Sequence, residues 1–272
     1  MEKTKQEITR EMLKENIMKK VLITMEYSST LDINKYIDEE NKLFYEYFRS
    51  YNSGEEKEIK IEIGNQSKVL ENNIVGGIHL FKGFVNNDQI EENVQLSVTK
   101  NNINFEIDPE NNYKCIDPYI KSLIRILSSM KKVDPFLKIN KVILKKNSFK
   151  IYESLENLFE DFEKKIISSS NEEYERKLIR EIETIKYKSF LIFYNRGIET
   201  GIIQKEGKPQ TAFRGYLDIS GILENDNLED IKEINDLEKV LQNLNLALFD
   251  IFKNSMTESF LNKNIGGIVE EN

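Results

Sequence analysis

The sequence predicts an α+β protein in which mainly antiparallel sheets are covered by helices and the chain ends in a long helix. Apolar and polar residues alternate in several short segments that turn residues separate, which is typical of antiparallel strands. Apolar residues at steps of three and four predict helices, but these do not interleave regularly with the strands as a parallel sheet would require. We therefore expect hairpin strands with helices packed on them.

No proline-rich segment or run of like charges divides the 272 residues, so one compact unit is expected. Residues 1–20 are predicted as an N-terminal arm or short helix. Residues 21–167 form an α+β first half, and residues 171–272 form a second half that carries the terminal helix.

In the first half, the hairpin of residues 94–98 and 103–107 has the strongest alternation, and Asn101-Asn102 supplies its turn. Helices are predicted over 34–48, with Asp32 or Asn34 as the cap, and over 119–130 after Asp117-Pro118. Gly76-Gly77 is interpreted as a turn. The other predicted strands are 21–27, 59–63, 69–74, 78–85 and 137–144.

The second half begins with a helix over 154–167 that Ser154 can cap. Residues 174–185 fit either a helix or a strand, and we favour a strand. Strands are also predicted over 187–194 and 211–219, with turns at 195–197 and 206–209. The terminal helix is predicted over 228–261, capped by Asp226-Asn227. Its core-facing stripe is Leu237, Leu241, Leu244, Leu248 and Phe252.

Composition excludes several classes of protein. The net charge of -8 argues against a general nucleic-acid binder, because phosphate binding depends on Lys and Arg. The single Cys115 excludes an intramolecular disulfide and a multi-cysteine zinc site within one chain. No apolar run of about 18 residues occurs and the N-terminus is charged, so we expect a cytoplasmic protein without a membrane span.

The single histidine, His79, lies in a predicted strand between Ile78 and Leu80 and points to the opposite face from them. One imidazole cannot form a two-histidine metal site. His79 and Cys115 are the only Cys/His pair available for nucleophilic catalysis, and a structural role for both is the favoured interpretation.

A basic stripe follows residues 137–152 and is formed by Lys141, Lys145, Lys146 and Lys150. With Phe149 and Tyr152 nearby, such a stripe can hold single-stranded nucleic acid through charge and stacking. Solvated lysines also protect an edge strand from aggregation, and that interpretation is favoured. At the other end of the chain, Met256 and Phe260 are predicted to reach beyond the domain to a partner.

Carboxylate pairs such as Asp108 with Glu110, or Asp218 with Asp226, could bind a divalent ion, but helix capping explains Asp226 more simply. Neither Gly76-Gly77 nor Gly266-Gly267 has the spacing of a phosphate-binding loop. The sequence thus predicts no metal, no cofactor and no catalytic set.

The order of predicted elements, together with residues 136–145 and 215–219, resembles a sporadically distributed family of bacterial α+β proteins of similar length with no established activity. In that family the middle strand has a Gly-Leu-Arg-Tyr type sequence, whereas Ile143-Leu144-Lys145-Lys146 occupies the region here. The resemblance implies a single compact unit and a patchy distribution that suits accessory or mobile genes, including those of phage defence.

The leading hypothesis is a noncatalytic accessory protein that binds a protein partner. Such an acidic protein could act as an antitoxin or as an inhibitor that offers carboxylates to the basic groove of a nucleic-acid enzyme. One alternative is an RNA- or nucleotide-processing enzyme that uses His79 with nearby carboxylates, or Lys145 and Lys146. Another is a homodimeric structural protein whose interface is the terminal helix.

Overall fold

The computed structural model describes residues 3–13, 17–62, 68–87, 89–109, 115–163, 178–224, 228, 231 and 233–265. The strands are β1 (Met18–Ser28), β2 (Phe48–Glu62), β3 (Lys68–Asn86), β4 (Gln89–Val98), β5 (Asn102–Ile107), β6 (Lys138–Tyr152), β7 (Leu178–Tyr187), β8 (Phe190–Lys205) and β9 (Lys208–Glu224). The helices are the 3₁₀ turn η1 (Arg10–Met12), α1 (Ile33–Glu39), α2 (Asn41–Tyr47), α3 (Asp117–Val133), α4 (Leu155–Asp161), α5 (Asp236–Ser255) and α6 (Glu258–Lys263).

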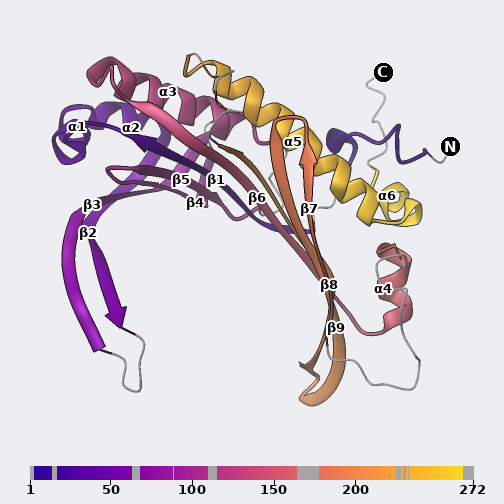
Figure 1. The fold of residues 1–272 in the computed structure, drawn as a ribbon. Helices are drawn as coiled ribbons and strands as arrows, with labels where there is room; N and C mark the ends of the chain where they lie inside the picture. Colours follow the sequence, from indigo (N-terminus) through magenta and orange to yellow (C-terminus); the bar gives the residue numbers. More distant parts are fainter. Residues whose placement is uncertain are drawn as a thin grey trace.

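The strands form one nine-stranded sheet in the order β2-β3-β4-β5-β1-β6-β9-β8-β7. Neighbouring strands are antiparallel throughout this order. The sheet arches, and α3 and α5 lie along the outer side of the arch (Figure 1). The predicted α+β class with antiparallel strands is confirmed, with the sheet as the dominant element. Among the described helices, none has the length and apolar character needed to cross a membrane.

Two halves of similar connectivity meet at the centre of the sheet, where β1 pairs antiparallel with β6. In the first half, β1 leads through α1 and α2 to β2, and the last strand β5 returns beside β1 before α3 begins. In the second half, β6 leads through α4 to β7, and the last strand β9 returns beside β6 before α5 begins. The fold therefore repeats one supersecondary pattern.

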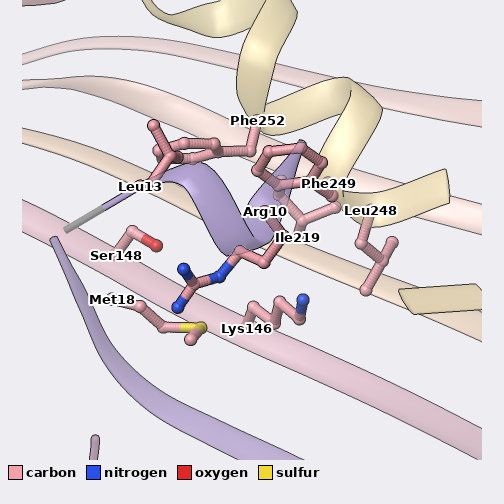
Figure 2. A pocket seen from close by; sticks show the side chains of 9 residues that line it. All are labelled: Arg10, Leu13, Met18, Lys146, Ser148, Ile219, Leu248, Phe249 and Phe252. Carbon is pink, nitrogen blue, oxygen red and sulfur yellow. The ribbon is translucent and has the colours of Figure 1, made fainter. Parts of the chain in front are cut away.

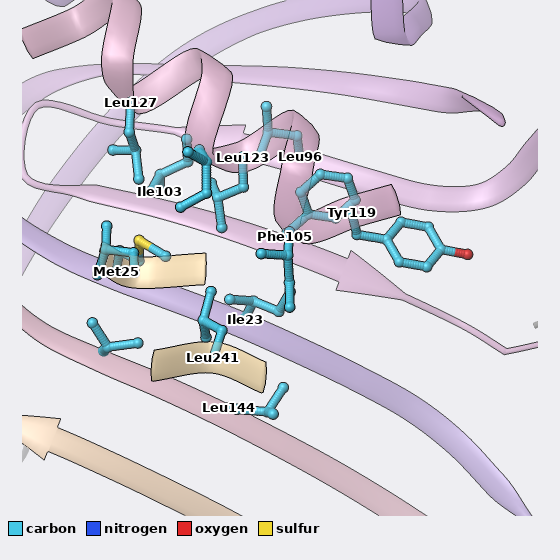
Figure 3. Close-up of a cluster of buried hydrophobic side chains, with 14 of the residues drawn as sticks. Ile23, Met25, Leu96, Ile103, Phe105, Tyr119, Leu123, Leu127, Leu144 and Leu241 are labelled. Atoms are coloured by element: carbon cyan, nitrogen blue, oxygen red, sulfur yellow. The ribbon is translucent and has the colours of Figure 1, made fainter. Parts of the chain in front are cut away.

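The main core lies between the sheet and α3 and α5. Leu123 and Leu127 of α3 and Leu241 of α5 are fully buried against Ile23 of β1 and Leu144 of β6 (Figure 3). These residues alternate along the strands and recur at helical spacing, so one face of each element is apolar. Burial of such a side chain contributes about 1.5 to 3 kcal/mol to folding.

A second apolar cluster lies at the C-terminal end of α5. It contains Ile8 and Leu13 near η1, Leu158 of α4, and Met256 and Phe260 around the start of α6. The N-terminal segment is held there because Leu13 forms an isolated β-bridge with Ile265 and the backbone of Lys3 exchanges two hydrogen bonds with the side-chain amide of Asn262. Residues near both ends of the described chain thus belong to one cluster.

The helices depart from the prediction at their ends. The helix expected over 34–48 is two helices, because Glu40 leaves the helical region with ψ at 21° between α1 and α2. Asp32 caps α1 as predicted, by accepting hydrogen bonds from the backbone N–H groups of Asn34 and Lys35. The terminal helix begins at Asp236 rather than at residue 228, and Met256 and Thr257 separate α5 from α6. The predicted cap Asp226-Asn227 lies outside the described residues.

Several predicted turns are wrong because the strands are longer than the alternation indicates. Gly76 and Gly77 continue β3 and pair with Glu56 and Glu55 of β2. A side chain at Gly77 would collide with Asn34 of α1, so this glycine permits a close approach within a strand. Residues 195–197 likewise run through β8. The turn at Glu206-Gly207 is confirmed, and both residues have positive φ angles.

Candidate functional site

The sheet face turned away from α3 and α5 carries none of the described helices (Figure 1). On β1, Val21, Ile23 and Met25 are fully buried beneath the helices, whereas the intervening Leu22 and Thr24 are only half-buried. We call this second surface the open face. Its centre is formed by Leu22, Thr24, Ile143, Lys145, Leu191, Phe193, Ser220 and Ile222.

Strand register brings the central residues of the open face into two rows across four strands. Thr24 lies opposite Ile143, and Ile143 and Leu191 both lie opposite Ile222. In the next row, Leu22 pairs with Lys145, followed by Ser220 and Phe193. Directly opposed residues on one face lie about 4.5 to 5.5 Å apart at Cβ, so these side chains form one continuous surface.

Lys145 is the charged group at the centre of this surface. Its side chain is exposed, and it makes no ion pair with the residues that the structure describes. The neighbouring strand positions hold Leu22 and Ser220, with Ile143 two residues away on β6. An exposed ammonium group beside half-buried aliphatic side chains suits a partner that brings both apolar surface and a carboxylate.

Around the centre, two lysines of the open face are paired with carboxylates. Lys141 contacts Glu224 at 3.1 Å. Lys20 pairs with Glu106 in the same way. The protein itself therefore neutralises these two cations of the rim.

Beyond the two rows, Phe149 and Tyr216 lie opposite each other on β6 and β9. The guanidinium of Arg214 lies 4.5 Å from the centre of the Phe149 ring and 5.7 Å from that of Tyr216. Lys19 lies 5.6 Å from the Phe149 ring centre, and Arg214 also pairs with Glu199 at 2.9 Å. Arg214 and Lys19 therefore make cation–π contacts with the ring faces on which nucleic-acid bases would stack.

The predicted basic stripe is not a stripe. Strand β6 lies at the centre of the sheet rather than at its edge. Successive side chains of a strand point to opposite faces, so the four lysines are divided between the two faces of the sheet. Lys141 and Lys145 lie on the open face, whereas Lys146 is buried beneath α5, where it donates a hydrogen bond to Asn245 Oδ1 at 2.5 Å. Lys150 pairs with Asp161 at 2.8 Å. Protection of an edge strand is therefore the wrong explanation for these residues.

His79 has a structural position. It is 3% exposed, its Nδ1 lies 2.8 Å from the hydroxyl of Tyr51, and its Nε2 lies 2.9 Å from Asn34 Oδ1. Burial lowers the pKa of the imidazole, and the charge of Asp38 opposes that shift. Both ring nitrogens are occupied, so neither faces Cys115. The pKa of the Cys115 thiol is raised, mainly by burial, which disfavours the reactive thiolate.

Met256 and Phe260 do not reach beyond the domain. Met256 is completely buried and Phe260 is 2% exposed, and both belong to the second apolar cluster. The break between α5 and α6 turns these side chains back toward the sheet. The expectation that they form a partner surface is therefore wrong.

Each predicted carboxylate pair has one member outside the described residues. Asp218 accepts a hydrogen bond from the Asn147 amide at 2.7 Å, while Glu110 and Asp226 lie outside the described residues, as does Gly266-Gly267. Within the part of the chain that the structure describes, no group of three metal-ligating side chains occurs.

Comparisons with known proteins find no family model that matches this chain and no curated protein that is significantly similar to it.

Proposed function

We propose that this chain is a noncatalytic, cytoplasmic binding protein and that the open face is the surface on which it holds a protein partner. The observation that carries the proposal is the half-buried aliphatic centre of that face, from Leu22 on β1 to Phe193 on β8, in a sheet whose other face is covered by helices. An apolar centre with a polar rim is the usual anatomy of a protein interface.

The charges of the open face favour a protein over a nucleic acid. Binding to a phosphate backbone depends on cations that can replace counterions. Lys20, Lys141 and Arg214 are instead engaged with carboxylates of the same sheet. Arg214 additionally covers the Phe149 ring, which reduces the stacking surface for a base.

The partner should present an apolar segment with a carboxylate opposite Lys145. This chemistry differs from the inhibitor hypothesis, in which the protein itself offers carboxylates to a basic groove. That role would need free acidic groups, and three glutamates of the open face, Glu224, Glu106 and Glu199, are paired with neighbouring cations. The open face therefore favours an accessory protein that receives an acidic, partly apolar partner.

Affinity capture from a lysate of the native host tests the proposal with the full chain as bait. Lys145→Glu reverses the central charge, and Ile143→Ser removes part of the apolar centre. We expect each variant to lose the captured protein by at least tenfold, because interface energy concentrates at central residues. Nuclease treatment of the lysate should leave the wild-type capture unchanged.

Two matched variants serve as controls. Lys239→Glu makes the same charge change on the exposed surface of α5, and Leu246→Ser removes a side chain that is 59% exposed on that helix. Both should retain the partner. Equal loss in all four variants, or loss only in the two α5 variants, would contradict the proposal. If the bait captured only nucleic acid, a nucleic-acid-binding function would replace the proposal. If light scattering showed a homodimer and no other protein were captured, a homodimeric function would replace it.

A further inference from the structure

The apolar centre of the open face is only two rows deep along the strands. Beyond it on one side, Asn147 of β6 lies opposite Asp218 of β9. Beyond it on the other side, Lys141 of β6 lies opposite Glu26 and Glu224. A strand rises about 3.4 Å per residue, so the two rows, which are two residues apart, lie about 7 Å from each other. Polar rows therefore bound the centre at both ends of the strands.

Across the strands the centre is longer, because it spans β1, β6, β9 and β8. Polar residues again lie beyond it. Asn104 and Glu106 of β5 pair with β1, and Thr184 and Lys186 of β7 pair with β8. Neighbouring strands lie about 4.8 Å apart, so β1 and β8 are separated by about 14 Å. The centre is thus about twice as long across the strands as along them.

The hydrogen bonding of the sheet favours a helix as the segment that covers this centre. Each of β1, β6, β9 and β8 already pairs with a strand on both sides. An extended segment lying on the face would therefore leave its own N–H and C=O groups without backbone partners, whereas an α-helix satisfies them internally. Unpaired backbone groups are costly on an apolar surface, so a helix fits and an extended segment does not.

The opposite face of the same strands already holds a helix. Leu248 and Phe249 of α5 line one small cavity together with Ile219 of β9 and Lys146 of β6 (Figure 2). Asn245 of α5 also accepts a hydrogen bond from Lys146. The central strands therefore pack against a helix on one of their two faces.

We propose that the partner docks through one amphipathic α-helix of about three turns, which lies across β1, β6, β9 and β8 and places a carboxylate beside Lys145. This inference rests on the proposed function. A helix rises about 1.5 Å per residue, so about ten residues cover the distance of about 14 Å between β1 and β8. The apolar side chains of that helix recur at i, i+3, i+4 and i+7.

The carboxylate is placed by charge. Lys145 is exposed on β6, inside the apolar centre, and within the part of the chain that the structure describes it makes no ion pair. An aspartate or glutamate at the border of the helix's apolar stripe reaches this ammonium group while the stripe covers Ile143 and Ile222. The same helix lying along the strands would instead place apolar side chains on the polar row of Asn147 and Asp218.

Photo-crosslinking amino acids at the ends of each row, in the full chain and in the native host, test the orientation. Leu22 and Phe193 end one row, and Thr24 and Leu191 end the other. Mass spectrometry then locates the crosslinked residue of the partner. We expect the two ends of a row to reach sites about seven to eleven residues apart in one segment of the partner. The two rows measure this separation independently, so either row decides if a variant of the other misfolds.

Positions 191 and 193 lie on one strand and provide the matched control, because their sites should fall within about four residues of each other. Sites from β1 and β8 that are also within about four residues would indicate an extended segment or a helix along the strands. Sites in separate segments would indicate a surface built from several elements. Each of these results overturns the inference and leaves docking on the open face intact. No protein adduct from any position of the centre would overturn the proposed function as well.

Substitutions in the crosslinked segment of the purified, full-length partner test the helix and its carboxylate. Proline on the polar side of the segment should weaken binding by about tenfold or more, and alanine at the same position should not, because proline breaks a helix. Replacing the carboxylate by its amide should weaken binding to the wild type by about threefold. Against Lys145→Met this loss should vanish, and against Lys239→Met it should persist. Equal binding of the proline and alanine variants, or an undiminished loss with Lys145→Met, would overturn the inference.

Discussion

At the scale of single residues, the packing of α5 on the sheet depends on an absent side chain. A Cβ atom at Gly221 of β9 would lie within 3.0 Å of Leu244 Cγ, and closer still to a methyl group of that leucine. Leu244 is fully buried, so it has little room to move. Gly221 therefore sets how closely the helix approaches the strand.

We predict that Gly221→Ala lowers the free energy of unfolding by about 1 to 3 kcal/mol through overpacking. Chemical denaturation measures this effect. The additional cost of Gly221→Ala should be smaller when Leu244 is already alanine, because the collision is then removed. Gly201→Ala on β8 is the control, since no atom lies within 4 Å of the position that its Cβ would take, and its effect should stay close to zero.

We predict that His79 makes the free energy of unfolding depend on pH. Its pKa in the folded protein is lowered from the ordinary value of 6.5, so the unfolded state binds more protons near that pH. The contribution of His79 to stability is complete above pH 6.5 and is lost as the pH falls through the lowered pKa. His79→Gln should therefore show a smaller loss of unfolding free energy between pH 7 and pH 5 than the wild type.

His79 is the chain's only histidine, so the comparison is clean. Lys146 affects the free energy of unfolding in a different pH range. Its pKa is lowered to about 7 in the folded protein, so its effect falls between pH 7 and the ordinary pKa of 10.5. If the unfolding free energy of wild type and of His79→Gln depended on pH in the same way, burial would not lower the pKa of the imidazole.

The alternation of residues places His79 on a strand but does not identify its surroundings. Its partners Tyr51 and Asn34 are 28 and 45 residues away in the chain, and they meet it only through the β2–β3 pairing and the approach of α1. The same limit applies to Lys146 and Asn245, which are 99 residues apart. Local patterns predict which face a residue occupies once strand bounds are known, but long-range pairing selects its partners.

At the scale of elements, the ends of strands and helices decide where functional side chains point. The sequence pattern ends the middle strand at residue 144, whereas β6 continues to Tyr152 through a polar segment that the neighbouring strands β1 and β9 hydrogen-bond on both sides. Tertiary pairing thus overrides the weak local preference of lysine and asparagine for strands. This extension divides the lysines between the two faces.

The break between α5 and α6 is stabilised by Thr257. Its hydroxyl accepts a hydrogen bond from the backbone N–H of Phe260 at 3.1 Å and donates one to the carbonyl of Glu160. We predict that Thr257→Ala lowers the free energy of unfolding by about 1 kcal/mol, the usual cost of a lost N-cap, whereas Thr257→Ser retains most of the stability. Equal stability of Thr257→Ala and wild type in urea titrations would contradict this role.

At the scale of the whole molecule, two halves of like connectivity share one sheet and leave its second face without a described helix (Figure 1). Fold class and most strand positions could be predicted because alternation is local. The junction of β1 with β6, which creates the continuous surface, could not, since no sequence repeat marks it. For the same reason the predicted binding residues include little of the open face, apart from Lys141 and Lys145.

The central claim is that the partner docks on the open face around Lys145. A photo-crosslinking amino acid placed at position 145 of the full chain, in the native host, tests it most directly. Position 239 on α5 provides the matched exposed lysine on the opposite side of the molecule. We predict a specific protein adduct from position 145 and none from position 239. Adducts only from position 239, or no protein adduct from position 145, would contradict the account.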